Sequence, residues 1–221
     1  MIRSTLAAIS IVLMTTSSVV AEGAKEIKWE DLIPATAELV DPFEQLTTDQ
    51  LYDLETLAYY RQLQAQGEKL DDIGIPDEIN EAEIKLKEAS LDIEKLLDQY
   101  TSYLNEIKRR DQLVVTGLDG EIIRLAGYAL PLEMTDTGVT EFFLVPYIGA
   151  CIHVPPPPPN QMVLIKLDKP FNADDLYMPV WVTGRLSTQF ASKELSLVDG
   201  QSTIDTGYTL KATQVAAYEA E

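Results

Sequence analysis

The only cysteine and the only histidine of the chain, Cys151 and His153, lie two residues apart in the segment Gly149 to Val154. If that segment is extended, residues at positions i and i+2 point to the same face, so the thiolate and the imidazole could meet one ion or one partner group. Both are good ligands for zinc and copper, which makes a transition-metal site the sharpest hypothesis. A structural zinc site normally has four ligands, so the others would be carboxylates, water or groups of another molecule.

Five consecutive prolines follow this pair directly, Pro155, Pro156, Pro157, Pro158 and Pro159. They favour a polyproline II helix of about 15 Å, at ~3.1 Å per residue, which has no amide hydrogens to offer a sheet. Such a ridge either shapes a fixed loop or fits an aromatic groove of a partner. We therefore expect the proline ridge and Tyr147 to form a partner contact, and Cys151 with His153 to bind metal.

Two other interpretations of the pair stay open. Imidazole could take the proton of the thiol and make Cys151 a nucleophile, as in thiol-dependent enzymes, although no nearby residue is placed to orient His153. Alternatively, Cys151 is a small buried apolar residue and His153 makes a structural hydrogen bond. The sequence contains no phosphate-binding glycine loop, and its acidic clusters lack the spacing of a calcium loop.

The first residues have the pattern of a secretory signal. A basic start at Arg3 precedes the uncharged stretch from Leu6 to Met14, and small residues lead to a cleavage position after Ala21. The apolar run is shorter than the ~20 residues that usually span a bilayer. We expect an exported, periplasmic protein whose segment 1–21 is removed and which is peripheral to the membrane at most.

Charge restricts the partners. The formal net charge is −19 and becomes −20 if Arg3 leaves with the signal. A surface this acidic repels phosphate backbones, so nucleic acid is not an expected partner, whereas cations and basic protein surfaces are. With one cysteine the chain cannot form an internal disulfide and must rely on its core for stability.

The middle of the chain has the apolar spacing of helices. Thr47 and Gln50 form a capping-box pattern that predicts a helix to about Gln66. Beyond the turn at 71–76, nine apolar positions between Ile79 and Ile107 are spaced alternately by three and four. This predicts one long second helix, and with the first an antiparallel hairpin over 47–110, although the same seam could form a coiled-coil dimer.

The last third has the pattern of strands. Short runs rich in branched and aromatic residues occur at 114–116, 121–130, 141–147, 162–167, 180–188 and 208–218. Asp119-Gly120 indicates a hairpin turn between the first two runs. Gly127 and Gly184 lie inside strands, where glycine allows the sharp bends of a closed barrel. The predicted fold is thus α+β: a docking segment at 22–46 that uses Trp29, Leu32 and Ile33, the helical hairpin, and a small five-stranded OB-like β-barrel at 111–221, with a β-sandwich as the alternative.

The segment from Phe142 to Val154, with its prolines, Asn160 and Gln161, resembles the signature of a group of secreted bacterial proteins known as domain of unknown function 3299. The stretches Leu125 to Glu133 and Trp29 to Pro34 fit the same resemblance. It implies export to the periplasm and a link, in some members, to ABC transport systems for zinc or other metals. It implies no catalytic residues.

From these observations we expect a non-enzymatic accessory or binding protein of an envelope transport or metal-handling system. Zinc is the expected metal, and an envelope ABC transporter or another periplasmic protein is the expected partner. The alternatives are a thiol-dependent enzyme that uses Cys151 and His153, and a structural envelope protein that docks through its helices.

Overall fold

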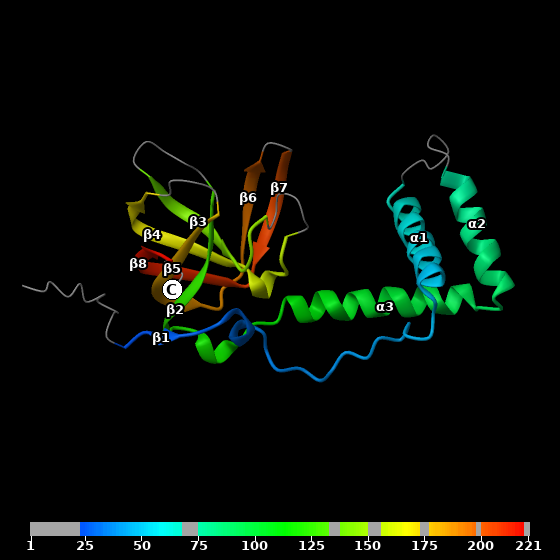
Figure 1. Cartoon of the computed structure of the whole chain (residues 1–221), viewed down its shortest axis with the longest axis horizontal. Coiled ribbons are helices and arrows are strands. Elements are labelled where there is room, and N and C mark those ends of the chain that lie inside the picture. Colours follow the sequence, from blue (N-terminus) through cyan, green and yellow to red (C-terminus); the bar gives the residue numbers. More distant parts are fainter. Residues whose placement is uncertain are drawn as a thin grey trace, which may run out of the picture.

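The structure is a computed structural model that describes residues 23–67, 75–132, 138–149, 156–172, 177–197 and 200–218. It has two parts with separate hydrophobic cores, a helical head and a β-barrel, and a long helix and an extended N-terminal segment connect them (Figure 1). The signal-peptide prediction and the turn at Asp71 to Gly74 lie outside the described residues.

Three helices form the head and its connection to the barrel. Their bounds are α1 (Thr48–Ala65), α2 (Ile75–Glu88) and α3 (Ile93–Asp111). The predicted capping box is confirmed, because the Thr47 side chain accepts from the Gln50 amide at 3.2 Å and Gln50 accepts from the Thr47 amide at 2.9 Å. These two bonds satisfy amides that the first turn of a helix leaves without partners.

The prediction of one long second helix was wrong, because the apolar seam is divided between α2 and α3. Ser90 takes a left-handed conformation, with φ 58°, and its amide donates to the Lys87 carbonyl. The amide of Leu91 donates to the Leu86 carbonyl, which completes a Schellman motif. Asp92 then caps α3 by accepting from the Lys95 amide. The helical hairpin is therefore α1 with α2, and α3 crosses beneath both (Figure 1).

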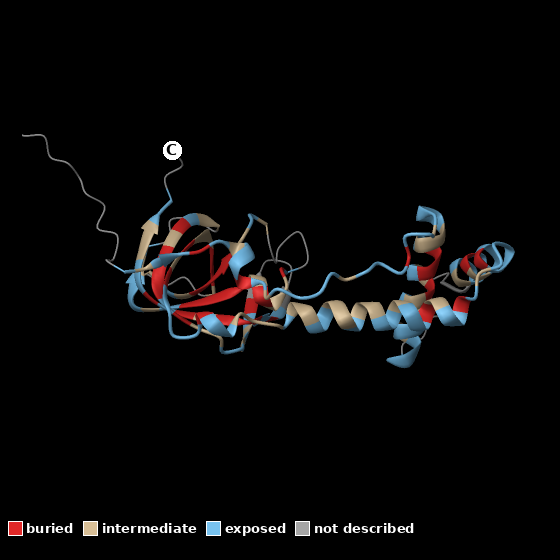
Figure 2. Ribbon diagram, turned by 90° about the horizontal axis from the view of Figure 1, so that it is seen from below, coloured by how far each residue is buried: buried red, intermediate tan, exposed pale blue. Residues whose placement is uncertain are grey.

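The core of the head collects one face of each helix. Phe43, which precedes α1, packs its ring against Tyr100 and Tyr103 of α3 at centroid distances of 5.6 and 5.8 Å. The other buried residues are Leu54, Leu57, Ala82, Leu86, Ile93 and Leu97. From Thr101 to Asp111 no residue of α3 is buried, and we call this exposed or half-buried half of the helix the stalk (Figure 2).

The C-terminal part is a closed barrel of five strands. They are β2 (Ile122–Pro131), β3 (Val139–Val145), β4 (Val163–Phe171), β5 (Met178–Ser187) and β8 (Tyr208–Ala217). Neighbours follow the order β2-β3-β4-β8-β5, and β5 pairs with β2 to close the barrel. Only the β4–β8 pair is parallel among these strands. The prediction of an OB-like five-stranded barrel after the helices is confirmed.

Alternating residues fill the barrel and cover one outer face. Phe142 and Leu144 point into the main core, whereas their neighbours Phe143 and Val145 point outward. Two strands that were not predicted, β6 (Ala191–Leu197) and β7 (Gly200–Thr206), form a hairpin over this outer face. Leu195 of β6 and Ile204 of β7 complete a second core there with Met162 and Leu164.

The two strand glycines are places of close approach. A Cβ atom at Gly127 would lie 2.8 Å from the Leu144 side chain, and one at Gly184 would lie 2.3 Å from the Lys211 carbonyl oxygen. The predicted strand at 114–116 is absent: a 3-10 turn, Thr116–Leu118, stands there and Asp119-Gly120 ends it. The stalk therefore enters the barrel through a turn instead of a hairpin.

The N-terminal segment packs on the barrel before it reaches the head. Its strand β1 (Lys25–Glu26) pairs in parallel with β2, and Ile27 and Leu32 are buried. The Trp29 indole donates to the Ala126 carbonyl at 2.8 Å. Docking of Trp29 and Leu32 is thus confirmed, while Ile33 is 50% exposed, contrary to expectation. Residues 34–42, which we call the strap, then run beside α3 from the barrel to the head (Figures 1 and 2).

Candidate functional site

The predicted metal ligands Cys151 and His153, and Pro155 after them, lie outside the described residues. The structure does describe the two ends of the β3–β4 connection, which contains these residues. The first end runs from Pro146 to Gly149 and the second from Pro156 to Gln161. The second end lies where barrel and stalk meet, because the Asn160 side chain contacts the end of α3.

The first end changes abruptly from buried to exposed. Val145 is fully buried, whereas Tyr147 is 43% exposed and Ile148 is 65% exposed. Gly149 has φ 86°, a left-handed conformation that glycine adopts without strain. An exposed aromatic and an exposed aliphatic side chain therefore stand four and three residues before the cysteine.

The second end is held by the barrel. Pro156 is exposed, Pro157 is buried, and Pro158 and Pro159 are half-buried. The Pro158 carbonyl accepts from the Gln161 amide at 2.7 Å, in a 3-10 turn at Pro159–Gln161. The Pro159 carbonyl accepts from the Gly207 amide at 2.6 Å. Of the five predicted contact prolines, Pro156 has the most exposed surface among the four that are described.

Asn160 and Gln161 connect this turn to other parts of the chain. Asn160 is only 4% exposed, and its amide donates to the Arg110 carbonyl at 3.0 Å, at the end of α3. The Gln161 amide donates to the Trp29 carbonyl at 2.9 Å. Two adjacent side chains thus fasten the end of the loop to the stalk and to the N-terminal segment. The sequence predicted no contact for either side chain, because only the fold brings their partners close.

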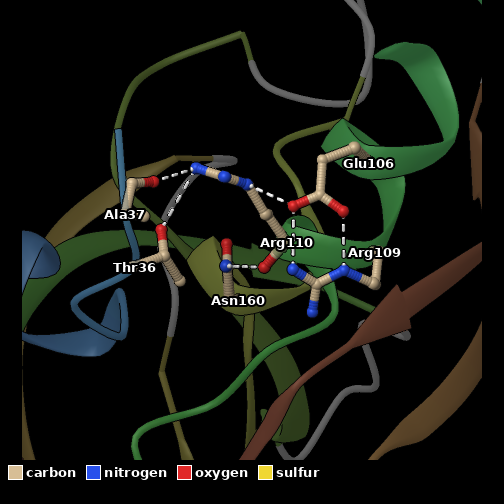
Figure 3. Close-up of polar contacts among 6 residues, drawn as sticks. All are labelled: Thr36, Ala37, Glu106, Arg109, Arg110 and Asn160. Atoms are coloured by element: carbon tan, nitrogen blue, oxygen red, sulfur yellow. Dashed lines mark hydrogen bonds and ion pairs between the residues drawn. The ribbon is translucent and has the colours of Figure 1, made fainter. Parts of the chain in front are cut away.

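Arg110 completes the junction by holding the strap (Figure 3). Its guanidinium donates to the Ala37 carbonyl at 2.6 Å and to the Thr36 hydroxyl at 3.3 Å. It also donates to Glu106 at 2.8 Å, and Arg109 forms a two-pronged pair with the same carboxylate. Loop, stalk and strap therefore meet at one residue, whose carbonyl and guanidinium serve different partners.

Glu106 lies in a strongly cationic environment. Hydrogen bonds from Arg109 and then Arg110 lower its pKa from 4.5 to about 2. The reciprocal bond raises the pKa of Arg109. The last turn of α3 carries Lys108 as well, which complements the negative end of the helix dipole.

Tyr208 at the start of β8 binds two segments with one hydroxyl. The O–H donates to the Leu32 carbonyl, and the oxygen accepts from the Val115 amide, both at 2.7 Å. Burial raises the pKa of this tyrosine, because the interior disfavours the phenolate. The bond to Leu32 fixes the N-terminal segment, and the bond to Val115 fixes the end of the stalk.

The barrel face that OB-folds commonly use for ligands is covered in this chain. OB-folds bind oligonucleotides and oligosaccharides on the face of their second and third strands. Those strands are β3 and β4 here, and the β6–β7 hairpin packs on their outward residues Phe143, Val145 and Leu164. Within the described part of the chain, this face therefore has no exposed surface on which a nucleic acid or a sugar chain could bind.

The head has a groove between α1 and α3. It has a volume of about 530 Å³ and is lined by Tyr59, Leu97, Tyr100 and Leu104 among others. Arg61 also lines the groove and forms an ion pair with Glu94. Within the described ranges no group of three or more His, Cys, Asp or Glu residues could hold a metal ion, and no described helix is long and apolar enough to cross a membrane.

Comparisons with known proteins agree with the resemblance seen in the sequence. A family model with the description "Protein of unknown function (DUF3299)" matches residues 29–217. A crystal structure of a DUF3299 family protein from Pseudomonas aeruginosa PAO1 shares 30% identity, over 90% of this chain and 98% of that one, with a TM-score of 0.49. No curated protein matches the chain. The chain belongs to the DUF3299 family of proteins of unknown function.

Proposed function

We propose that the chain is an exported accessory or binding protein of an envelope transport or metal-handling system, and that it acts by binding instead of catalysis. The observation that carries this proposal is the anchoring of the β3–β4 connection. Its end at Asn160 and Gln161 is bonded to the stalk and to the N-terminal segment, at 3.0 and 2.9 Å. This end is also bonded to Gly207, at 2.6 Å, so one end of the connection is held at three places, which suits the presentation of a binding group near the junction.

The binding groups of that loop are Cys151 and His153. They supply two soft ligands, and zinc or copper would take its remaining ligands from carboxylates, water or a partner. The exposed Tyr147 and Pro156 stand on either side of the pair and offer an apolar contact to that partner. The site would then be completed when the partner binds.

The covered outer face of β3 and β4 and the net charge of −19 support a protein ligand or a cation over a polyanion. The apolar stretch and the small residues before Glu22 support export. In the periplasm a lone cysteine is exposed to oxidation, and a bound metal ion would protect the thiolate.

Zinc titration of the mature protein tests the metal part of the proposal. Cys151→Ser and His153→Ala should each lower zinc affinity by tenfold or more, and Ser102→Ala on the exposed stalk should leave it unchanged. Affinity should also fall below pH ~6, where protons compete for the imidazole. Equal affinity in the wild type and both ligand variants would overturn the metal assignment.

A second candidate function is docking to an envelope protein through the helices. Tyr52 and Tyr59 of α1 are 69% and 58% exposed, and Tyr59 also lines the groove between α1 and α3. Tyrosine is enriched in protein interfaces because it combines apolar area with a polar tip. A photo-crosslinking residue at position 59 should capture an envelope protein if this function is right, and the same residue at exposed position 88 should not.

A further inference from the structure

The outer surface of the barrel carries a row of like charges. Lys166 of β4 stands directly opposite Lys211 of β8, and Lys211 stands directly opposite Arg185 of β5. All three side chains are exposed. Like charges at opposed positions of neighbouring strands are unfavourable, so a row of three has no stabilising reason within the sheet.

The surrounding carboxylates neutralise this row only in part. Glu141 is shared by Lys193 at 2.8 Å and Lys166 at 3.9 Å, and Asp168 pairs with Lys211 at 3.2 Å. Five basic side chains of this surface, which we call the basic patch, have two carboxylates as ion-pair partners among the described residues. This leaves a formal excess of three positive charges. The basic patch consists of Lys166, Lys169, Arg185, Lys193 and Lys211, of which Lys193 joins through the Glu141 carboxylate that it shares with Lys166. This excess occurs in a chain whose net charge is −19.

A groove of about 680 Å³ runs through the basic patch. Lys169, Arg185 and Lys211 are among the residues that line it. Its apolar lining includes Phe171 and Val215, which are partly buried against the barrel core. The groove thus combines an apolar floor with a rim of three basic side chains and one carboxylate, that of Asp168.

Both strands that border the groove are irregular there. Between the pairs Val139–Phe171 and Glu141–Lys166, β4 has four residues opposite one residue of β3. In β8 the register shifts between the pairs with Thr183 and Gly184. Bulges at barrel rims commonly redirect side chains toward a binding site.

The same region has open strand edges. The ladder between β4 and β8 ends at Leu167 and Ala212, while β4 continues to Phe171 and β8 to Ala217. Beyond that point no described strand pairs with the edge of β4 or β8 that faces the groove. Unpaired amides and carbonyls at such an edge can bind an extended peptide as an added strand.

We propose that this groove binds an extended acidic segment of a partner protein. The backbone of the segment would pair with the open edges of β4 or β8, its carboxylates would meet the basic patch, and its alternate apolar side chains would lie on Phe171 and Val215. Charge complementarity identifies the occupant as acidic, and the open edges identify it as extended. The groove lies at the end of β4 away from Val163 and the stalk, so it is separate from the Cys151–His153 loop.

Fluorescence anisotropy tests this with a short labelled peptide in which glutamate alternates with valine. The peptide should bind the full mature chain, and Lys169→Glu with Lys211→Glu together should weaken binding at least tenfold. Lys95→Glu in the head makes a charge change of the same sign and should have no more than a twofold effect, because Lys95 lies on α3 far from the barrel. High salt should weaken binding, as expected of exposed charges.

Three comparisons can overturn the proposal. A peptide with lysine in place of glutamate should not bind, and one with methylated alternate amides should bind at least fivefold more weakly, because it cannot pair as a strand. If the lysine peptide binds equally well, the segment is not acidic, and if the methylated peptide binds equally well, the segment does not pair as a strand.

Binding to phosphatidylglycerol vesicles through the basic patch, without peptide binding, would assign the groove to a membrane surface instead. Lys169→Ala and Lys211→Ala, checked by tryptophan fluorescence for native folding, repeat the test without introducing new charges.

Discussion

Substitution of Tyr208 by phenylalanine should loosen the junction without changing its packing. The ring of Tyr208 is fully buried and would stay in place. The variant loses the hydrogen bonds to the Leu32 carbonyl and from the Val115 amide, both 2.7 Å long in the wild type. A buried polar group that loses its partner costs about 1–3 kcal/mol, and a half-buried one costs less because water reaches it.

The free energy of unfolding of the barrel should therefore fall by about 2–4 kcal/mol. For a chain of this size that corresponds to a decrease in Tm of roughly 5–15 °C. Urea unfolding followed by tryptophan fluorescence is a suitable assay, because both tryptophans, Trp29 and Trp181, lie on the barrel. The signal then reports the barrel and not the separately packed head.

A matched control is Tyr218→Phe. Tyr218 is 42% exposed and stacks on Trp181 with a centroid distance of 5.5 Å, a contact that phenylalanine keeps. The free energy of unfolding of the Tyr218→Phe variant should differ from that of the wild type by less than ~0.5 kcal/mol. If Tyr208→Phe is as mild as this control, the Tyr208 hydroxyl does not fasten the N-terminal segment and the stalk, and the reasoning about the junction is wrong.

Three further substitutions test other parts of the account. Gly127→Ala should destabilise the barrel by about 1–3 kcal/mol, because the new methyl group would meet Leu144 at 2.8 Å, while Gly117→Ala, with nothing within 4 Å, should be neutral in urea unfolding. The pKa of Glu106 is depressed to about 2, so its contribution to stability is complete above pH ~4.5 and is lost as pH falls toward 2. Glu106→Gln should therefore flatten the pH dependence of Tm across that window. An unchanged curve would contradict the pairing of Glu106 with the two arginines. Leu195→Ala should cost about 2–4 kcal/mol and expose the outer barrel face to the dye ANS, and a variant without increased ANS fluorescence would show that the hairpin does not cover that face.

The sequence predicted the parts of the fold that local patterns determine. Thr47 and Gln50 marked the start of a helix because their capping bonds need only four residues. Gly127 and Gly184 indicated a barrel because close strand approach excludes any side chain at those places. Trp29 and Leu32 were recognised as docking residues by their apolar surface.

The errors have physical reasons. The break between α2 and α3 uses Ser90 in a left-handed conformation where glycine is usual, and the apolar spacing continues across it, so periodicity could not reveal it. The β6–β7 hairpin carries polar residues on most positions and is held by Leu195 and Ile204, which is too few for a strand signal. At 114–116 the branched residues favour a strand, but the packing of the stalk on the barrel selects a turn.

The anchoring of the candidate site was also beyond sequence reasoning. The contacts of Asn160 with Arg110 and of Gln161 with Trp29 join residues far apart in the chain, and only the fold brings them together. The hypothesis about Cys151 and His153, in contrast, rests on residue type and spacing alone. The assignment of a metal to that pair stays a prediction.

X-ray absorption spectroscopy of the zinc-loaded mature protein tests the central proposal most directly. If the β3–β4 connection binds zinc, the spectrum should show one sulfur ligand at about 2.3 Å and at least one nitrogen ligand at about 2.0–2.1 Å. The sulfur shell should disappear in Cys151→Ser. A zinc shell made of oxygen and nitrogen alone in the wild type would contradict the proposal, because Cys151 is the only thiol that the chain can offer.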